Sequence, residues 1–359
     1  MSRPRLVPRM DANYDLLREL TESHGAPGHE DRIRDIVRRE LADVVDDIRT
    51  DAMGNVVATV EGAETPDYEV AVAAHMDEIG FMVTHVTDAG FLKLDALGGW
   101  DPRVLRAQRV TVHASEGDIE GVIGSPPPHT MSEEERESTD EVADLYVDLG
   151  RDGETVADLV SVGDVVTMAQ DTRVLGDTVT GKSMDDRVCL FAMLEAAKRI
   201  TPDVTVHFAA TVQEEVGLRG AKALGVDLDP DLALALDVTV ANDIPQFSDE
   251  SKHVTELGEG AAIKLKDGSV ITNPKVHKRM QSVAETRDIA HQLEVLPAGG
   301  TDTAGFQNTN GAKPVGAISV PLRYMHTVTE AAHEDDIDAT VDLLAAVLDT
   351  EDGAHDYQL

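Results

Sequence analysis

The stretch Val70-Ala71-Val72-Ala73-Ala74-His75-Met76-Asp77-Glu78 runs from five apolar residues directly into a histidine and two carboxylates. The apolar part predicts a buried strand. Three other apolar runs end in a similar way. They are Val206–Val212, followed by Gln213-Glu214-Glu215; Leu232–Leu236, followed by Asp237; and Val315–Val320, followed after a short loop by His326.

These strand ends predict a common site, because ligands of open α/β sheets gather beyond the carboxyl ends of the strands. Two imidazoles with several carboxylates suit zinc, cobalt or manganese, whereas calcium and magnesium prefer oxygen ligands alone. Each residue taken singly is weak evidence. A histidine at a strand end is more often structural, and a Glu-Glu pair is usually a solvated turn. Their joint placement favours a metal site that includes His75, Glu215, Asp237 and His326.

A fifth segment, Thr180–Arg187, is predicted to turn from a strand into a helix. Asp185 lies at that junction, where its carboxylate could bridge two ions. The alternative is that Asp185 caps the N-terminus of the helix, and the segment alone does not decide between the two.

The remaining pattern indicates an α/β fold interrupted by a β-rich insertion. Helical spacing or strand-like runs predict helices over 13–24, 31–48, 186–200, 218–224, 280–292 and 334–348, and strands over 54–60, 68–74, 204–212, 232–236 and 314–320. Short alternating strands at 80–86, 90–94 and 109–113 are typical of a small β barrel or sandwich. Ser125–Glu141, with three prolines and an acidic run, is expected to be a loop. Both ends of the chain would form one helix-flanked sheet.

The composition excludes several function classes. A net charge of -37 makes nucleic acid and anionic membranes poor partners. Only 10 of the 31 basic residues are lysine, and the acid is spread over the whole chain, which favours a protein from a salt-rich cytoplasm. A single cysteine, Cys189, precludes an internal disulfide. Because apolar runs of about 18 residues and a secretory leader pattern are absent from the sequence, we expect a cytoplasmic protein.

The motifs together resemble the tetrahedral (TET) and glutamyl aminopeptidase family of dinuclear metallopeptidases. The resemblance covers nearly the whole chain and is carried, in order, by His75–Gly80, Gly98–Pro102, Met184–Arg187, Glu214–Gly217, Ala235–Asp237, Gly299–Asp302 and Arg323–His326. It implies an α/β, helix-flanked mixed-sheet catalytic domain of the phosphorylase/hydrolase-like zinc-peptidase type, formed by residues 1–79 and 173–359. Residues 80–172 would be an inserted small β-barrel domain.

The resemblance also implies a role for each site residue. Asp185 would bridge two divalent ions, with Glu215 and His326 on one ion and His75 and Asp237 on the other. Glu214 would be the general base, and Asp77 would orient the His75 imidazole. Zinc is the expected metal, with cobalt or manganese as alternatives.

The implied activity is that of an aminopeptidase, which removes N-terminal residues from short peptides by means of an activated water. The barrel would drive dimerisation, and dimers would form a hollow tetrahedral dodecamer. Departures are small: Thr327 and Val328 follow His326 where the family often has a proline. Rival interpretations are an amino-acid deacylase or carboxypeptidase on the same scaffold, and a non-catalytic metal-binding assembly protein. A glycosidase would require two carboxylates that are not committed to metal.

Overall fold

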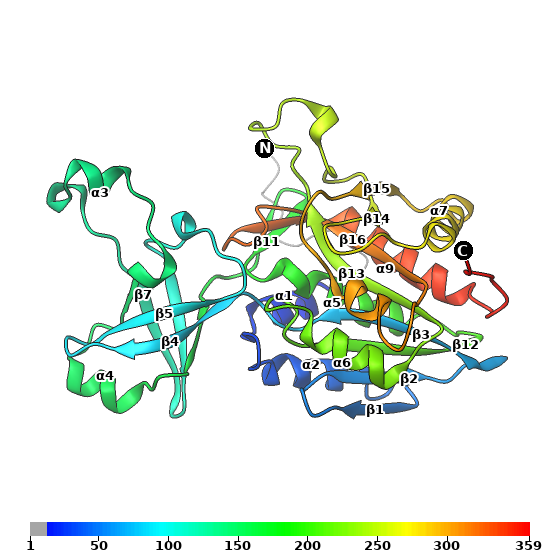
Figure 1. The fold of residues 1–359 in the computed structure, drawn as a ribbon, viewed down its shortest axis with the longest axis horizontal. Coiled ribbons are helices and arrows are strands. Elements are labelled where there is room, and N and C mark those ends of the chain that lie inside the picture. The colour runs from blue at the N-terminus through cyan, green and yellow to red at the C-terminus, as the bar shows by residue number, and fades with distance from the viewer. Residues whose placement is uncertain (1–12) are drawn as a thin grey trace, which may run out of the picture.

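In the computed structural model, residues 13–359 are described, and they form two distinct parts (Figure 1). A mixed sheet of 11 strands with helices on its faces occupies the right of the view, and a closed barrel of six antiparallel strands lies on the left. The predicted fold class, a helix-flanked α/β sheet with an inserted small barrel, is confirmed.

The large sheet combines strands from both ends of the chain. Its order is β1-β2-β12-β3-β13-β16-β17-β11-β10, and β14 pairs with both β15 and β16. The bounds are β1 Asp47–Thr50, β2 Val56–Val60, β3 Thr65–His75, β10 Arg173–Leu175, β11 Thr178–Gly181, β12 Val204–Thr211, β13 Leu232–Val240, β14 Ala261–Lys266, β15 His291–Val295, β16 Val315–Arg323 and β17 Glu330–His333.

The centre of this sheet is a parallel block, β12-β3-β13-β16. Its apolar runs are almost wholly buried, as expected for parallel strands that helices cover on both faces. The register places Thr211 opposite His75 and Ala235 opposite Ala73. The carboxyl ends of the four strands with predicted ligands therefore lie side by side.

Helices pack on both faces of the sheet, and α5 is the most deeply buried of them. Residues Val188–Leu194 of α5 are fully buried, and this helix contacts α1, α9, β3 and β13. The helices of this part are α1 Tyr14–Glu22, α2 Asp31–Leu41, α5 Met184–Ala197, α6 Arg219–Leu228, α7 Pro274–Arg287, α8 Asp302–Gln307 and α9 Glu334–Asp349.

The barrel closes in the order β4-β5-β8-β7-β6-β9 around its own apolar core. Its elements are β4 Gly80–Val86, β5 Phe91–Leu97, β6 Arg109–Ala114, β7 Gly117–Ile123, α3 Glu133–Glu137, β8 Tyr146–Asp148, α4 Gly153–Leu159 and β9 Val165–Met168. The predicted Ser125–Glu141 loop contains the short helix α3, so that part of the expectation is corrected. The loop borders a cavity of about 670 Å³ on the barrel, which holds none of the predicted site residues.

Two predicted helices have different limits in the structure. The helix expected over 31–48 ends at Leu41, and Ile48 belongs to strand β1 instead. The helix expected over 280–292 runs from Pro274 to Arg287, while His291 and Gln292 belong to β15. Asn273 caps α7 by accepting hydrogen bonds from the amides of Lys275 and Val276, which fixes its earlier start.

Candidate metal centre

The predicted ligands converge at the carboxyl edge of the central strands. His75 is the last residue of β3, Glu214 and Glu215 follow β12, and Asp185 stands in the first turn of α5. His326 lies three residues beyond β16. Asp237 was expected at the end of a strand, but β13 continues to Val240, so its carboxylate projects from within the strand.

Asp185 faces two imidazoles with its two carboxylate oxygens. Its Oδ1 lies 3.2 Å from His75 Nε2, and its Oδ2 lies 3.3 Å from His326 Nε2. Asp185 has non-helical backbone angles, and the N-cap position of α5 is occupied by Ser183 rather than by Asp185. The geometry therefore favours a bridging carboxylate over the N-cap alternative. The peptide bond between Asp185 and Asp186 is cis.

The ligand atoms form two groups that share Asp185. One group comprises His75, Asp185, Asp186 and Asp237, and the other comprises Asp185, Glu215 and His326; within each group the candidate ligand atoms lie within 4.8 Å of one another. The first group is closed to solvent, with only 2% of the His75 side chain exposed. The second is more open, because 35% of the His326 side chain is exposed. Substrate therefore has easier access to the His326 side.

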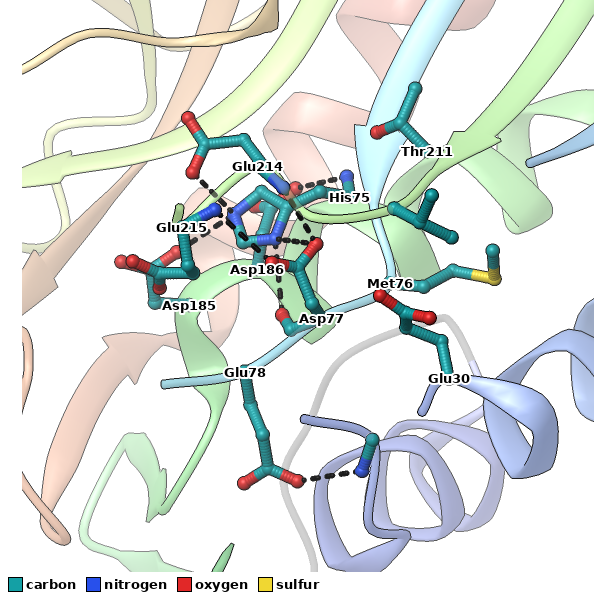
Figure 2. Close-up of polar contacts among 12 residues, drawn as sticks. Glu30, His75, Met76, Asp77, Glu78, Asp185, Asp186, Thr211, Glu214 and Glu215 are labelled. Atoms are coloured by element: carbon teal, nitrogen blue, oxygen red, sulfur yellow. Dashed lines mark hydrogen bonds and ion pairs between the residues drawn. The ribbon is translucent and has the colours of Figure 1, made fainter. Parts of the chain in front are cut away.

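Asp77 contacts the His75 ring through both its backbone and its side chain. The Nδ1 atom of His75 lies 3.0 Å from the carbonyl oxygen of Asp77 and 3.5 Å from its carboxylate (Figure 2). The carboxylate also accepts hydrogen bonds from the amides of Glu214, at 3.0 Å, and Glu215, at 3.1 Å. Asp77 thus connects the segment after β3 to the segment after β12.

Three groups to which the sequence analysis assigned no role hold these ligands in place. The carboxylate of Glu330 accepts hydrogen bonds from the amides of His326, at 2.7 Å, and Asp185, at 3.1 Å. The carbonyl oxygen of Gly99 lies 2.8 Å from His326 Nδ1. Asp186 accepts a hydrogen bond from the amide of His75, at 3.1 Å. Glu330 could have been noticed in the sequence as an acidic residue four positions after His326. The contact of Gly99 is made by its backbone carbonyl, which leaves no signal in the sequence.

The electrostatics of the cluster favour a bound cation. Burial, reinforced by the charge of Asp185, raises the pKa of Glu215 to about 8. Burial also raises the pKa of Asp237 to about 8, and that of Glu214 well above its usual range. Although burial alone would raise the pKa of Asp185, its contacts with His326 and His75 lower it. Carboxylates crowded in this way repel one another unless a positive charge lies among them.

The donor set gives a direct test of fit for a metal. Glu215 Oε1 is buried and has no hydrogen-bond partner. An unsatisfied buried carboxylate oxygen is costly unless it coordinates a cation. Two imidazoles and several carboxylates are a ligand set suited to zinc, cobalt or manganese. The residues therefore fit divalent metal ions at this position.

Other conspicuous residues have structural surroundings. His207, within β12, contacts the hydroxyl of Thr59 and the carboxylate of Glu69. Cys189 is fully buried in α5. Both belong to the packing of the part that contains the large sheet.

Comparison with known proteins decides the family. A family model described as M42 glutamyl aminopeptidase matches residues 54–343. The chain belongs to the M42 glutamyl aminopeptidase family. Within it, the chain is 38% identical over 339 residues to a putative aminopeptidase of Acetivibrio thermocellus, which covers 93% of this chain and 98% of that protein. It is 35% identical to the lysyl aminopeptidase of Pyrococcus furiosus, and that match covers 94% of this chain and 97% of that protein.

Solved structures of the family agree with this assignment. The TET1 peptidase of Pyrococcus horikoshii superposes with a TM-score of 0.85 at 34% identity, and the match covers 94% of this chain and 99% of that one. The M42 chain described here is thus a metal-dependent aminopeptidase, a hydrolase that acts on peptide bonds. The resemblance found in the motifs is confirmed. Among residues 13–359, the helices are all too short or too polar to span a bilayer.

Proposed function

We propose that this aminopeptidase removes N-terminal residues from short peptides at a centre of two divalent ions bridged by Asp185. The observation that carries the proposal is the placement of the Asp185 carboxylate, whose two oxygens face His75 and His326 separately. His75 and Asp237 would hold one ion, and Glu215 and His326 the other. Two such ions supply Lewis acidity, which lowers the pKa of a water and polarises the scissile carbonyl.

Glu214 is the proposed general base. Its Oε2 lies 3.9 Å from His75 Nε2, beside the ligands, and Glu214 is not needed in either ligand group. Burial raises its pKa well above the usual range, so the carboxylate readily accepts a proton from the attacking water. The same proton would then pass to the leaving amine. Asp77 fixes the backbone amides of Glu214 and Glu215 and thereby the direction of the base.

The finer identity of the metal and the assembly are also proposals. We propose zinc as the native ion, with cobalt or manganese as substitutes, because the ligands mix imidazole with carboxylate. The TET1 peptidase of Pyrococcus horikoshii is described as assembling into a tetrahedron or an octahedral shell. We propose a tetrahedral dodecamer for this chain, with residues 80–172 as the dimerising domain, in the cytoplasm of its cell.

A substrate and metal screen tests the function. Purified protein is treated with a chelator and assayed on dipeptides with a free amine and on the same peptides after N-acetylation. We expect activity on free-amine peptides only, its loss on chelation and its recovery with zinc or cobalt. Cleavage of acetylated peptides would indicate a deacylase or carboxypeptidase instead. Full activity of metal-free protein would refute the proposed centre.

A further inference from the structure

A short segment of the insertion packs against one half of the metal centre. Gly98, Gly99 and Trp100 follow strand β5 and precede the short helical turn Pro102–Val104. We call these three residues the strap. They belong to the barrel part of the chain, yet they lie against ligands of the catalytic part.

The two glycines approach the ligands so closely that a side chain would crowd them. A Cβ on Gly98 would lie 3.3 Å from Glu215 Oε2 and only 2.4 Å from a methyl carbon of Ile79. Gly98 also has a φ of +91°, which favours glycine. A Cβ on Gly99 would lie 3.1 Å from His326 Nδ1. The strap backbone is therefore packed directly on Glu215 and His326.

The carbonyl of Gly99 determines which nitrogen of the His326 ring carries the proton. A carbonyl oxygen can only accept a hydrogen bond, so the contact at 2.8 Å requires a proton on His326 Nδ1. The lone pair of a neutral ring then resides on Nε2, which faces Asp185 and Glu215. A metal-binding histidine needs such an acceptor at its other nitrogen to fix its tautomer and ring orientation.

Trp100 anchors the strap to the barrel. Its indole N–H donates to the carbonyl of Gly80, at 3.0 Å, and its ring stacks on Phe81 with centroids 5.1 Å apart and planes inclined by 14°. Phe81 is fully buried in the barrel core. The position of the Gly99 carbonyl thus depends on strand β4 of the barrel.

We propose that the strap is a positioning element for the His326 half of the metal centre, anchored through Trp100 to the barrel. The inference rests on the proposed two-ion centre. It assigns to the insertion a part in metal binding, beyond any part in assembly. The strap acts on one of the two ions, because the only candidate ligands among the described neighbours of Gly98 and Gly99 are Glu215 and His326, while His75 and Asp237 lie on the closed side.

Stepwise metal affinity tests this proposal without reference to turnover. Zinc is titrated into metal-free protein in competition with a chromophoric chelator, for wild type, Gly99→Ala, Trp100→Ala, Trp100→Phe and His326→Ala. His326→Ala identifies which of the two binding steps belongs to the His326 side. We expect Gly99→Ala, whose added Cβ would press on His326 Nδ1, and Trp100→Ala, which removes the anchor, to weaken that same step by about 10- to 100-fold, the usual cost of disturbing a group that orients a ligand. The other step should change less than about twofold.

Two comparisons separate positioning from general damage. Trp100→Phe keeps a ring that can stack on Phe81, so it should restore most of the affinity lost in Trp100→Ala. Gly99→Ala in the His326→Ala background should have no further effect on the remaining step. Val162→Thr, at an exposed barrel position, is the matched control and should leave both steps unchanged.

The proposal is overturned if Gly99→Ala weakens neither step or both steps equally. If Trp100→Ala does not fold, Gly99→Ala still decides, because that change does not alter the barrel core. Failure of the two-ion centre itself looks different. In that case wild type would not bind two ions, or His326→Ala would remove neither step.

Discussion

Glu214 and Glu215 are sequence neighbours whose backbone amides share the carboxylate of Asp77. We nevertheless expect different effects when each of them is replaced by glutamine. Glu215→Gln should loosen the ion on the His326 side, because a neutral amide is a poorer ligand, so metal content and turnover should fall together. Glu214→Gln should retain both ions while the chemical step slows by about 10²- to 10⁴-fold, as for other general bases.

Metal analysis and single-turnover rates on both variants distinguish the two roles. Loss of an ion from Glu214→Gln with unchanged activity per ion would reverse the assignment. Glu259→Gln, an exposed change in the same catalytic part, is the control and should alter neither quantity.

Glu30, at the start of α2, is a buried carboxylate with one oxygen that has no hydrogen-bond partner. Burial, with a contribution from Asp77, raises its pKa to about 7 from 4.5. The folded protein therefore loses stability as the pH rises through this interval, by about 3 kcal/mol once the carboxylate is ionised. Glu30→Gln should be more stable than wild type at pH 8 and similar to it at pH 4.5.

Chemical denaturation at the two pH values measures this difference. Glu61→Gln, at an exposed position, serves as the control. An equal stability gain of Glu30→Gln at both pH values would mean that ionisation of Glu30 is not the cause.

At the scale of single residues, the sequence was informative where a ligand directly follows an apolar run, as His75 and Asp237 do. It was silent where a residue acts through backbone groups distant in sequence. The carboxylate of Glu330 accepts a hydrogen bond from the amide of Asp185, 145 positions away. The carbonyl oxygen of Gly99 contacts the ring nitrogen of His326, 227 positions away. Such pairs exist only after the sheet has formed, so neither spacing nor composition could reveal them.

Among the elements, β17 and the first turn of α5 are joined by the Glu330 carboxylate. Glu330→Gln leaves one acceptor oxygen for two amides, so one of the two ligand segments must lose its hydrogen bond. We expect metal affinity to fall by about 10- to 100-fold, with the secondary structure retained. Chelator competition and circular dichroism measure the two effects.

Glu285→Gln, on the exposed face of α7, provides the comparison for Glu330→Gln. Unaltered zinc affinity in Glu330→Gln would show that the backbone of Asp185 and His326 is held by other contacts. A fall in helix content alongside affinity would indicate a general loss of folding.

The accuracy of the predicted element boundaries depended on helix caps and on how clearly an apolar run is flanked by turn residues. Strand β4 was predicted at its observed limits, because glycine and aspartate turns flank an apolar run. Helix α7 was displaced because apolar spacing is weak in its first turn, where the Asn273 cap and Pro274 determine the start. Strands β14 and β15 were not predicted. They contain a buried lysine and a buried glutamate that pair with each other, Lys264 with Glu294, and in the sequence each of these charged residues interrupts a short apolar pattern.

For the whole molecule, the net charge of -37 predicts a strong dependence on salt. In dilute buffer the carboxylates repel one another over long distances, whereas at 1 M salt the Debye length is about 3 Å. We expect loss of assembly or unfolding at low salt and recovery in molar potassium chloride. Sedimentation velocity and thermal melting across a salt series measure both.

Sucrose at equal osmolality is the control for the salt series, because it is excluded from protein surfaces but does not screen charge. If sucrose restores assembly as well as salt does, charge repulsion is not the cause. An unchanged sedimentation coefficient and melting curve across the series would remove the argument for salt adaptation.

The order of strands also governs how the chain can fold as it leaves the ribosome. Strand β12 lies between β2 and β3, and Ala210 pairs with both Val56 and Ala74. All six strands of the barrel lie within residues 80–168 and are made before β12, although the barrel core also includes Val328. Strand β3 cannot pair until β12, more than 130 positions downstream, has been made. From residue 168 until β12 is made, the growing chain carries the barrel strands beside an apolar strand without neighbours, the kind of segment that chaperones bind and that aggregates when they are scarce.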